Sequence, residues 1–200
     1  MPKTVDCEQY RKKLLSKSFD LFAKKGYRST TMREIAQFIG VSTGKLYHYF
    51  PSKQALFEQL VEEISQQDEL KVTFDFDKHQ TWEERLETFE TFLVKQKESL
   101  IKRMYILIDF YRCQDSNEGL NSKISQQIIE RSLLEIHDFL GIEDPVLASF
   151  TFSLINGLII EHIRGNERVS IPEQCTLFKK ILKAYLEQGI SKNREKLIVH

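Results

Sequence analysis

Residues 41–53, VSTGKLYHYFPSK, gather most of the side chains that could do chemistry in the first quarter of the chain. Ser42 and Thr43 carry hydroxyls, Lys45 carries a positive charge, and Gly44 lets a partner approach the backbone closely. Phenol, imidazole and ammonium groups follow at Tyr47, His48, Tyr49 and Lys53. No nucleophile stands beside a base in this stretch, so the groups suit contact with a flat, negatively charged partner better than catalysis.

Two short helices are expected to position these groups. Thr31-Met-Arg-Glu34 has the spacing of a capping box, which predicts a helix that starts after Thr31 and ends at Gly40. After Val41, Ser42 is a good N-cap for a second helix of barely two turns through Tyr49. Two such helices joined by Gly-Val-Ser form a helix-turn-helix pattern, whose second helix presents its N-terminal side chains to base edges in the major groove.

The remaining chain is patterned for helices throughout. Helical periodicity predicts helices near residues 8–25, 53–71, 82–97, 99–114, 118–140, 145–164 and 173–188, with a connector at 72–76 and a loosely held end at 193–200. The expected fold is all-α with about nine helices. We expect an N-terminal three-helix DNA-binding domain at 1–52 and a regulatory and dimerisation bundle at 53–200, with 53–71 as the connecting helix.

Charge is divided unevenly along a chain whose formal net charge is zero. Residues 1–56 hold 11 Lys and Arg against 4 Asp and Glu, whereas residues 57–200 hold 18 against 25. A basic head on an acidic body suggests that only the head meets a polyanion. No apolar run reaches the roughly 18 residues of a membrane span, no signal peptide is evident, and three distant cysteines favour reduced thiols, so we expect a cytoplasmic protein.

Residues 14–60 resemble the DNA-binding domain of TetR/AcrR-type bacterial transcriptional regulators. The resemblance rests on LFAKKGY, TTMREIA and GVSTGKLYHYFPSK, in the family's order and spacing, with Phe38-Ile39-Gly40 in place of a more usual Ala-Ala-Gly-like ending. It implies an all-helical homodimer with a variable ligand-binding bundle, usually a repressor that a small molecule releases from DNA. The positions that match the family's DNA contacts are Thr31, Ser42, Thr43, Lys45, Tyr47, His48 and Lys53, to which Thr30, Gly44 and Tyr49 are plausible additions.

Other interpretations of these head residues stay open. Leu46 and Phe50 suit a core better than a contact surface, and Tyr47 could pack its ring on the domain while its hydroxyl meets phosphate. His48 could bind a metal, although no partner lies at ligand spacing, so we expect no metal site.

The C-terminal bundle predicts its partners less clearly. Residues 145–164 are apolar nearly all round, which favours burial on two sides, and together with 173–188 they could form a two-fold dimer interface. Candidate walls of a ligand cavity are mostly aromatic: Phe89, Phe92, Tyr105, Asp109, Phe110, Phe152 and Asn156. Asp109 and Glu161 could recognise a cationic ligand, or they could form structural pairs, Asp109 with Arg103 or Arg112 and Glu161 with Arg164. Cys113 could sense oxidants or be a buried, inert thiol.

These observations point to a DNA-binding transcriptional regulator and not to an enzyme. The most favoured form is a ligand-responsive, dimeric repressor that binds a palindromic double-stranded DNA operator through residues 42–49, with an unknown small-molecule effector, no cofactor and no membrane partner. An activator, or a regulator controlled by a partner protein, is the alternative. A third possibility is an enzyme or structural bundle with an incidental helical hairpin, but the sequence has no nucleophile elbow, Gly-rich phosphate loop or metal-ligand spacing.

Overall fold

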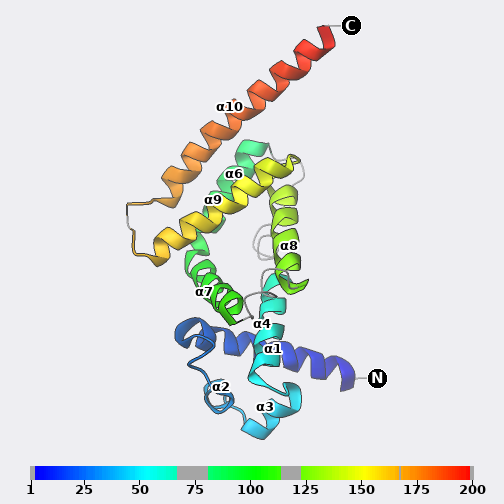
Figure 1. The fold of residues 1–200 in the computed structure, drawn as a ribbon, viewed down its shortest axis with the longest axis vertical. Coiled ribbons are helices and arrows are strands. Elements are labelled where there is room, and N and C mark those ends of the chain that lie inside the picture. The colour runs from blue at the N-terminus through cyan, green and yellow to red at the C-terminus, as the bar shows by residue number, and fades with distance from the viewer. Residues whose placement is uncertain (1–2, 67–80, 114–122, 167, 199–200) are drawn as a thin grey trace. The chain divides into compact units, whose positions relative to one another are not determined.

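The computed structural model describes residues 3–66, 81–113, 123–166 and 168–198 (Figure 1). These residues form helices and no strand, as the sequence predicts. The helices are α1 (Lys3–Lys25), α2 (Met32–Ile39), α3 (Thr43–Tyr49), α4 (Lys53–Gln66), α6 (Trp82–Lys95), α7 (Lys97–Cys113), α8 (Lys123–Leu140), α9 (Pro145–Ile163) and α10 (Ile171–Ile198). The predicted connector at 72–76 lies outside the described residues.

Most helix ends lie within two residues of their predicted positions, but two helices are longer. Helix α1 starts at Lys3, five residues before the expected start, and α10 runs to Ile198, ten residues beyond its expected end. The expected end of α10 was wrong because one glycine, Gly189, costs a helix only about 1 kcal/mol relative to alanine. The residues that follow it are rich in Lys, Arg and Glu, which are good helix formers.

The described residues form two compact units. Unit 1 contains α1 to α4, α7 from Glu98 onward, and α8 as far as Glu135; unit 2 contains α6, the last turn of α8, α9 and α10. The expected division at residues 52 and 53 separates functions, whereas these units are defined by packing. That division therefore stays a prediction.

The core of unit 1 joins the N-terminal helices to α7 and α8. Helix α1 packs on α2 and α4, and α2 packs on α3. Phe22 from α1, Phe57 from α4 and Phe110 from α7 are all buried, and the ring centroid of Phe57 lies 5.0 Å from that of Phe22 and 6.5 Å from that of Phe110. Because Ile128 of α8 joins the same cluster, the helix-turn-helix segment rests on a core that extends well beyond residue 52.

Unit 2 buries an aromatic group against the end of α8. Phe89 of α6 lies 5.4 Å from Phe139 of α8 between ring centroids, and α10 packs along α6. Asp144 caps the start of α9, since one of its carboxylate oxygens accepts hydrogen bonds from the backbone N–H groups of Val146 and Leu147. The other oxygen accepts a 2.5 Å bond from the hydroxyl of Tyr185, which is the largest cause of the lowered pKa of Asp144.

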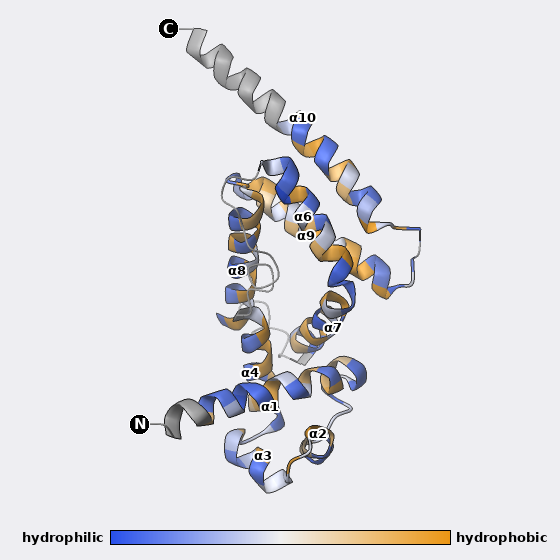
Figure 2. Cartoon of the chain, turned by 180° about the vertical axis from the view of Figure 1, so that it is seen from behind, coloured by the Kyte–Doolittle hydropathy of each residue, from blue (hydrophilic) through white to orange (hydrophobic). Residues whose placement is uncertain are grey.

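Helix α9 is apolar along its whole length, as Figure 2 shows by its orange ribbon. It buries Leu147, Ala148, Thr151 and Leu158, but Val146 and Phe150 remain 75% and 49% exposed. Its 19 residues would suffice to cross a membrane by length and composition, a test that a helix from the core of a soluble protein also passes. The exposed apolar side nevertheless requires some cover.

Candidate nucleic-acid interface

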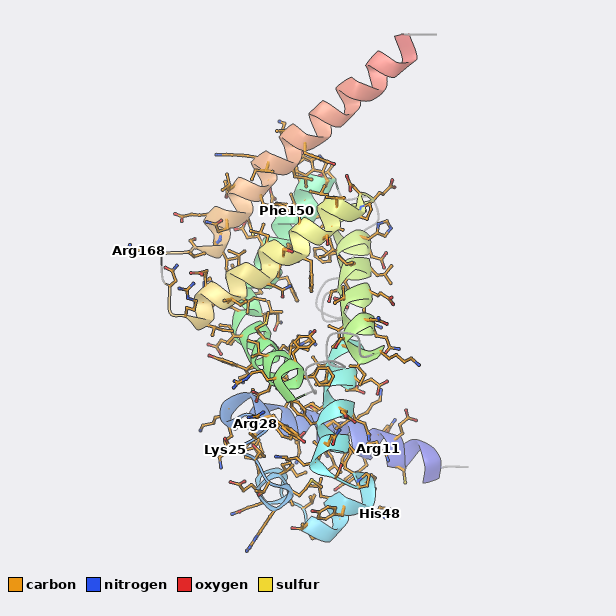
Figure 3. The ribbon with its side chains drawn as sticks, viewed as in Figure 1. Arg11, Lys25, Arg28, His48, Phe150 and Arg168 are labelled. Atoms are coloured by element: carbon orange, nitrogen blue, oxygen red, sulfur yellow. The ribbon has the colours of Figure 1, made fainter. Side chains whose placement is uncertain are left out.

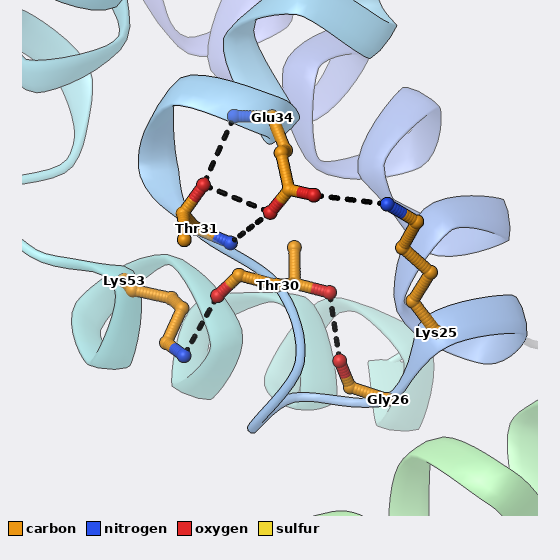
Figure 4. Close-up of polar contacts among 6 residues, drawn as sticks. All are labelled: Lys25, Gly26, Thr30, Thr31, Glu34 and Lys53. Atoms are coloured by element: carbon orange, nitrogen blue, oxygen red, sulfur yellow. Dashed lines mark hydrogen bonds and ion pairs between the residues drawn. The ribbon is translucent and has the colours of Figure 1, made fainter.

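A complete capping box fixes the start of α2, as predicted (Figure 4). The Thr31 hydroxyl oxygen accepts a hydrogen bond from the Glu34 N–H, and the Glu34 carboxylate accepts one from the Thr31 N–H at 2.9 Å. The ammonium of Lys25 lies 2.9 Å from the other carboxylate oxygen. Hydrogen bonds from Lys25 and then from Thr31 lower the pKa of Glu34 to about 2, so this box is charged and closed at neutral pH.

The turn and α3 follow the predicted pattern. Gly40 ends α2 with φ 77°, a left-handed conformation that glycine adopts without strain. Ser42 caps α3 by accepting a hydrogen bond from the Lys45 N–H at 3.2 Å. Leu46 and Phe50 are fully buried, which confirms that they anchor α3 in the core. Their burial fixes which face of this two-turn helix points outward.

The outward face of α3 carries most of the predicted contact residues. Ser42, Gly44, Lys45, Tyr47 and His48 are exposed, Thr31 is exposed at the start of α2, and Thr43, Tyr49 and Lys53 are half-buried. Figure 3 shows the labelled side chain of His48 on α3. Apart from Thr30 and Lys53, which lie on the inner side of the head, the predicted residues therefore share one accessible surface around the start and outer side of α3.

Helix α1 supports this surface through contacts that the sequence analysis missed. The ammonium of Lys45 lies 4.4 Å from the centroid of the Tyr10 ring, and the Tyr10 and Tyr49 centroids are 5.3 Å apart. A hydrogen bond with Tyr10 is the main cause of the raised pKa of Lys45. Arg11 donates to the Tyr49 carbonyl at 3.1 Å and to the Gln59 side chain at 3.0 Å. No local motif signals Tyr10 or Arg11, because their partners are more than 30 residues away in sequence.

Thr30 and Lys53 lie on the inner side of the head. The Thr30 side chain is fully buried and its hydroxyl donates to the Gly26 carbonyl at 2.7 Å. The Lys53 ammonium donates to the carbonyls of Tyr27 and Thr30, each at 2.8 Å, and lies 4.2 Å from the centroid of the Tyr27 ring (Figure 4). Both residues thus hold the loop between α1 and α2, and a contact with DNA remains a prediction for them.

Asp109, a predicted ligand contact, meets the same loop. Its Oδ2 accepts a 2.7 Å hydrogen bond from the Tyr27 N–H, a different partner from the expected Arg103 or Arg112. The physical reason is that the left-handed Gly26 turns the following N–H toward α7. Glu161 does form its expected pair, with Arg164 at 2.8 Å, and a hydrogen bond from Asn166 is the largest cause of its lowered pKa. The Cys113 side chain lies outside the described residues.

The other predicted ligand residues are divided between the units. Tyr105, Asp109 and Phe110 belong to unit 1, whereas Phe89, Phe92, Phe152 and Asn156 belong to unit 2. Phe89, Phe92 and Phe110 are buried core residues, and Tyr105 is 42% exposed. None of the seven lines the cavity that unit 1 contains between α4, α7 and α8. Across the described residues no group of three or more His, Cys, Asp or Glu is placed to hold a metal ion.

Comparison with known proteins identifies the N-terminal segment and the fold. Residues 14–60 match the family model described as bacterial regulatory proteins, tetR family. The HTH-type transcriptional repressor KstR2 of Rhodococcus jostii is 41% identical over 51 residues, which are 26% of this chain and 25% of that protein. The chain therefore aligns with about a quarter of the length of this curated relative.

Two solved structures share the fold over most of the chain. A transcriptional regulator of the TetR/AcrR family from Aquifex aeolicus has a TM-score of 0.59 and 22% identity, covering 88% of this chain and 98% of that one. The transcriptional regulator FadR from Bacillus subtilis, solved in complex with stearoyl-CoA, has a TM-score of 0.59 and 19% identity, covering 85% and 94%. At such identities the likeness establishes the all-helical fold and leaves the ligand open.

Proposed function

We propose that this chain, whose residues 14–60 carry the DNA-binding domain of the TetR family, is a ligand-responsive, dimeric transcriptional repressor that acts in the cytoplasm. The observation that carries the proposal is the exposed first turn of α3, held outward by the burial of Leu46 and Phe50. Ser42, Thr43 and Lys45 are the residues we assign to operator recognition. The uneven charge supports the assignment, because the excess of Lys and Arg lies in the part of the chain that carries α3.

Tyr47, His48 and Tyr49 are assigned to positioning the head on DNA. Tyr47 is 50% exposed although it is a large aromatic residue, and His48 lies beside it on the same helix. A phenol and an imidazole at this place can donate hydrogen bonds to phosphate oxygens, which fixes orientation without reading sequence. Lys53 would contribute its charge near the same backbone while its ammonium holds the loop before α2.

Two heads are required for a palindromic operator, and α9 and α10 offer the means to join them. Exposed apolar side chains occur on both helices: Val146, Phe150, Ile160, Leu177, Ile181 and Tyr185. A two-fold interface between copies would cover them and place two α3 helices in successive major grooves, roughly 34–36 Å or somewhat more apart. The related FadR structure holds stearoyl-CoA, which supports control by a small molecule but does not indicate which one.

A mobility-shift assay on the DNA upstream of the protein's own gene tests the proposal. The full-length protein is expected to bind at low salt and to lose affinity steeply as salt rises, because phosphate contacts release counterions. Lys45→Ala should abolish the shift, whereas Lys179→Ala, a lysine of α10 that pairs with Glu87, should leave it unchanged. Absence of any shift at low salt would count decisively against an operator-binding role.

A regulator without a small-molecule inducer is the second candidate. The largely buried aromatic residues in both units favour it, since Phe89, Phe92 and Phe110 fill core positions instead of lining a large cavity. Operator binding that no small molecule weakens, but that a second protein does, would support this form.

A further inference from the structure

A small cavity lies inside unit 1, where the end of α4 meets α7 and α8. Its volume is about 80 Å³. One side is apolar and is formed by Ile64, Leu107 and Ile128. A water molecule needs about 10–15 Å³ by the same kind of measure, so the cavity has room for roughly six water-sized atoms. It is too small for the large apolar ligands that fill pockets of about 300–1,000 Å³.

The other side of the cavity is polar and carries an excess of positive charge. Arg103 from α7 and Arg131 from α8 line it, and Glu135 is the only carboxylate among the lining residues. The guanidinium of Arg103 donates to the Ile64 carbonyl at 3.3 Å, which ties this side chain to the last turn of α4. Two cations and one anion around one small space leave a formal charge of +1, which a single negative charge would neutralise.

Arg131 and Glu135 form a loose pair that a ligand can share. The Arg131 Nε lies 3.6 Å from the Glu135 Oε1, within ion-pair range but beyond hydrogen-bonding distance. A guanidinium presents five N–H donors in one plane, so it can hold a protein carboxylate and a ligand carboxylate at the same time. Arginine is the side chain best suited to bind a planar, two-oxygen anion in this way.

We propose that this cavity binds a short-chain organic carboxylate, with its two oxygens on Arg103 and Arg131 and its alkyl chain against Ile64, Leu107 and Ile128. The Ser65 and Ser132 hydroxyls donate to the backbone carbonyls of Glu62 and Ile128, so they offer the ligand acceptor oxygens and add no competing donor. A cationic ligand is disfavoured by the two guanidinium groups. Inorganic phosphate would satisfy the arginines but leave the apolar side empty.

The site is connected to the DNA-binding head through α7. Arg103 and Leu107 line the cavity, and on the same helix Phe110 is buried in the head core and Asp109 holds the Tyr27 N–H. A ligand that favours one position of α7 therefore acts on the loop before α2. This regulatory consequence rests on the proposed function, whereas the binding of a carboxylate does not.

Isothermal titration calorimetry on the full-length protein tests the site with n-butyrate, n-butylammonium and inorganic phosphate. We expect butyrate to bind, phosphate to bind at least about tenfold more weakly, and butylammonium not to bind. Arg103→Gln and Arg131→Gln should each weaken butyrate binding at least about tenfold, because each removes a charge-assisted bond. Arg112→Gln, an exposed arginine near the end of the same helix, is the matched control and should leave it unchanged.

Two further variants separate charge recognition from loss of folding. Glu135→Gln should tighten butyrate binding, because it removes the competing carboxylate, and a folding defect could not produce that result. Arg131→Lys should retain part of the affinity, since it keeps the charge but loses the planar pair of donors. Binding of butylammonium, equal binding of phosphate, or no response to the arginine variants would overturn the proposal.

The mobility-shift assay on the same preparation distinguishes this inference from the proposed function. If the protein shifts its operator but no carboxylate binds, the cavity assignment fails and the regulator stands. If butyrate binds but no DNA is shifted, the regulator fails and the cavity assignment stands.

Discussion

The backbone N–H of Tyr27 donates a 2.7 Å hydrogen bond to the Oδ2 of Asp109, which joins the loop after α1 to the middle of α7. The two residues are separated by 82 positions in sequence. Gly26, immediately before Tyr27, has φ 77°, and a Cβ added there would lie 2.8 Å from the same carboxylate oxygen. The loop and α7 therefore fit closely at one point, and that point lies directly before the helix-turn-helix segment.

Asp109→Ala is expected to lower the free energy of unfolding by about 1–3 kcal/mol, because it leaves the part-buried Tyr27 N–H without its acceptor. Urea denaturation followed by circular dichroism measures the change. Asp20→Ala is the control: Asp20 pairs with Lys102 at the surface, and such exposed pairs contribute about 0–1 kcal/mol. Equal losses in the two variants would show that the bond to Tyr27 has no special role.

Gly26→Ala is expected to destabilise the protein more than Gly40→Ala. Both glycines have φ 77°, so an alanine at either position carries left-handed strain of about 1–2 kcal/mol. Only at Gly26 would the new methyl group also collide with Asp109, since nothing lies within 4 Å of a Cβ at Gly40. In a double-mutant cycle, the extra loss at Gly26 should shrink in an Asp109→Ala background. Additive effects in that cycle would contradict the close approach.

The helix-turn-helix segment could be predicted from the sequence because its determinants are local. The Thr31–Glu34 box, the Gly40 stop and the Ser42 cap each involve residues three or four positions apart or a single backbone conformation. Burial of Leu46 and Phe50 follows from helical spacing for the same reason. The ten predicted contact positions remain predictions about DNA, although the structure shows which of them are accessible.

The supporting contacts could not be predicted because they depend on which distant helices meet. Nothing near Lys53 indicates that its ammonium would lie between the carbonyls of Tyr27 and Thr30, 26 and 23 residues away. The same applies to Tyr10 beneath Lys45 and to Asp109 beside Tyr27. An aromatic residue in an apolar run indicates burial, but it does not say whether it fills a core or lines a cavity.

Tyr47→Phe and Thr43→Ala are expected to affect DNA binding in different ways. Tyr47→Phe removes one hydroxyl from an exposed ring, so it should weaken binding to all DNA sequences alike. Thr43→Ala removes a group from the first turn of α3 and should change which sequence is preferred, by about 1–3 kcal/mol at the affected base pair. Selection from a randomised operator library measures both effects. A changed sequence preference for Tyr47→Phe would contradict this division of roles.

Glu34→Gln is expected to change how the stability of the protein depends on pH. The folded-state pKa of Glu34, about 2, lies below the ordinary value of 4.5, so the charged box stabilises the fold above pH 4.5. This contribution is lost as pH falls from 4.5 toward 2, because the folded state must then also bind the proton. Urea midpoints at several pH values should show the wild type ahead at pH 7 and the difference closing below pH 4.5. A difference that stays constant down to pH 3 would show that the charge on Glu34 is not responsible.

Ile181→Glu is expected to convert a dimer into monomers. Ile181 is 45% exposed on α10 and lies between Leu177 and Tyr185, which are 50% and 48% exposed at one-turn spacing. An unpaired carboxylate in an apolar two-fold interface would weaken association at least about a hundredfold. Light scattering coupled to size-exclusion chromatography should give half the wild-type mass, whereas Ile129→Glu, a 44% exposed isoleucine of α8 in unit 1, should leave the mass unchanged. A monomeric wild type, or a dimer that persists in Ile181→Glu, would place the interface elsewhere.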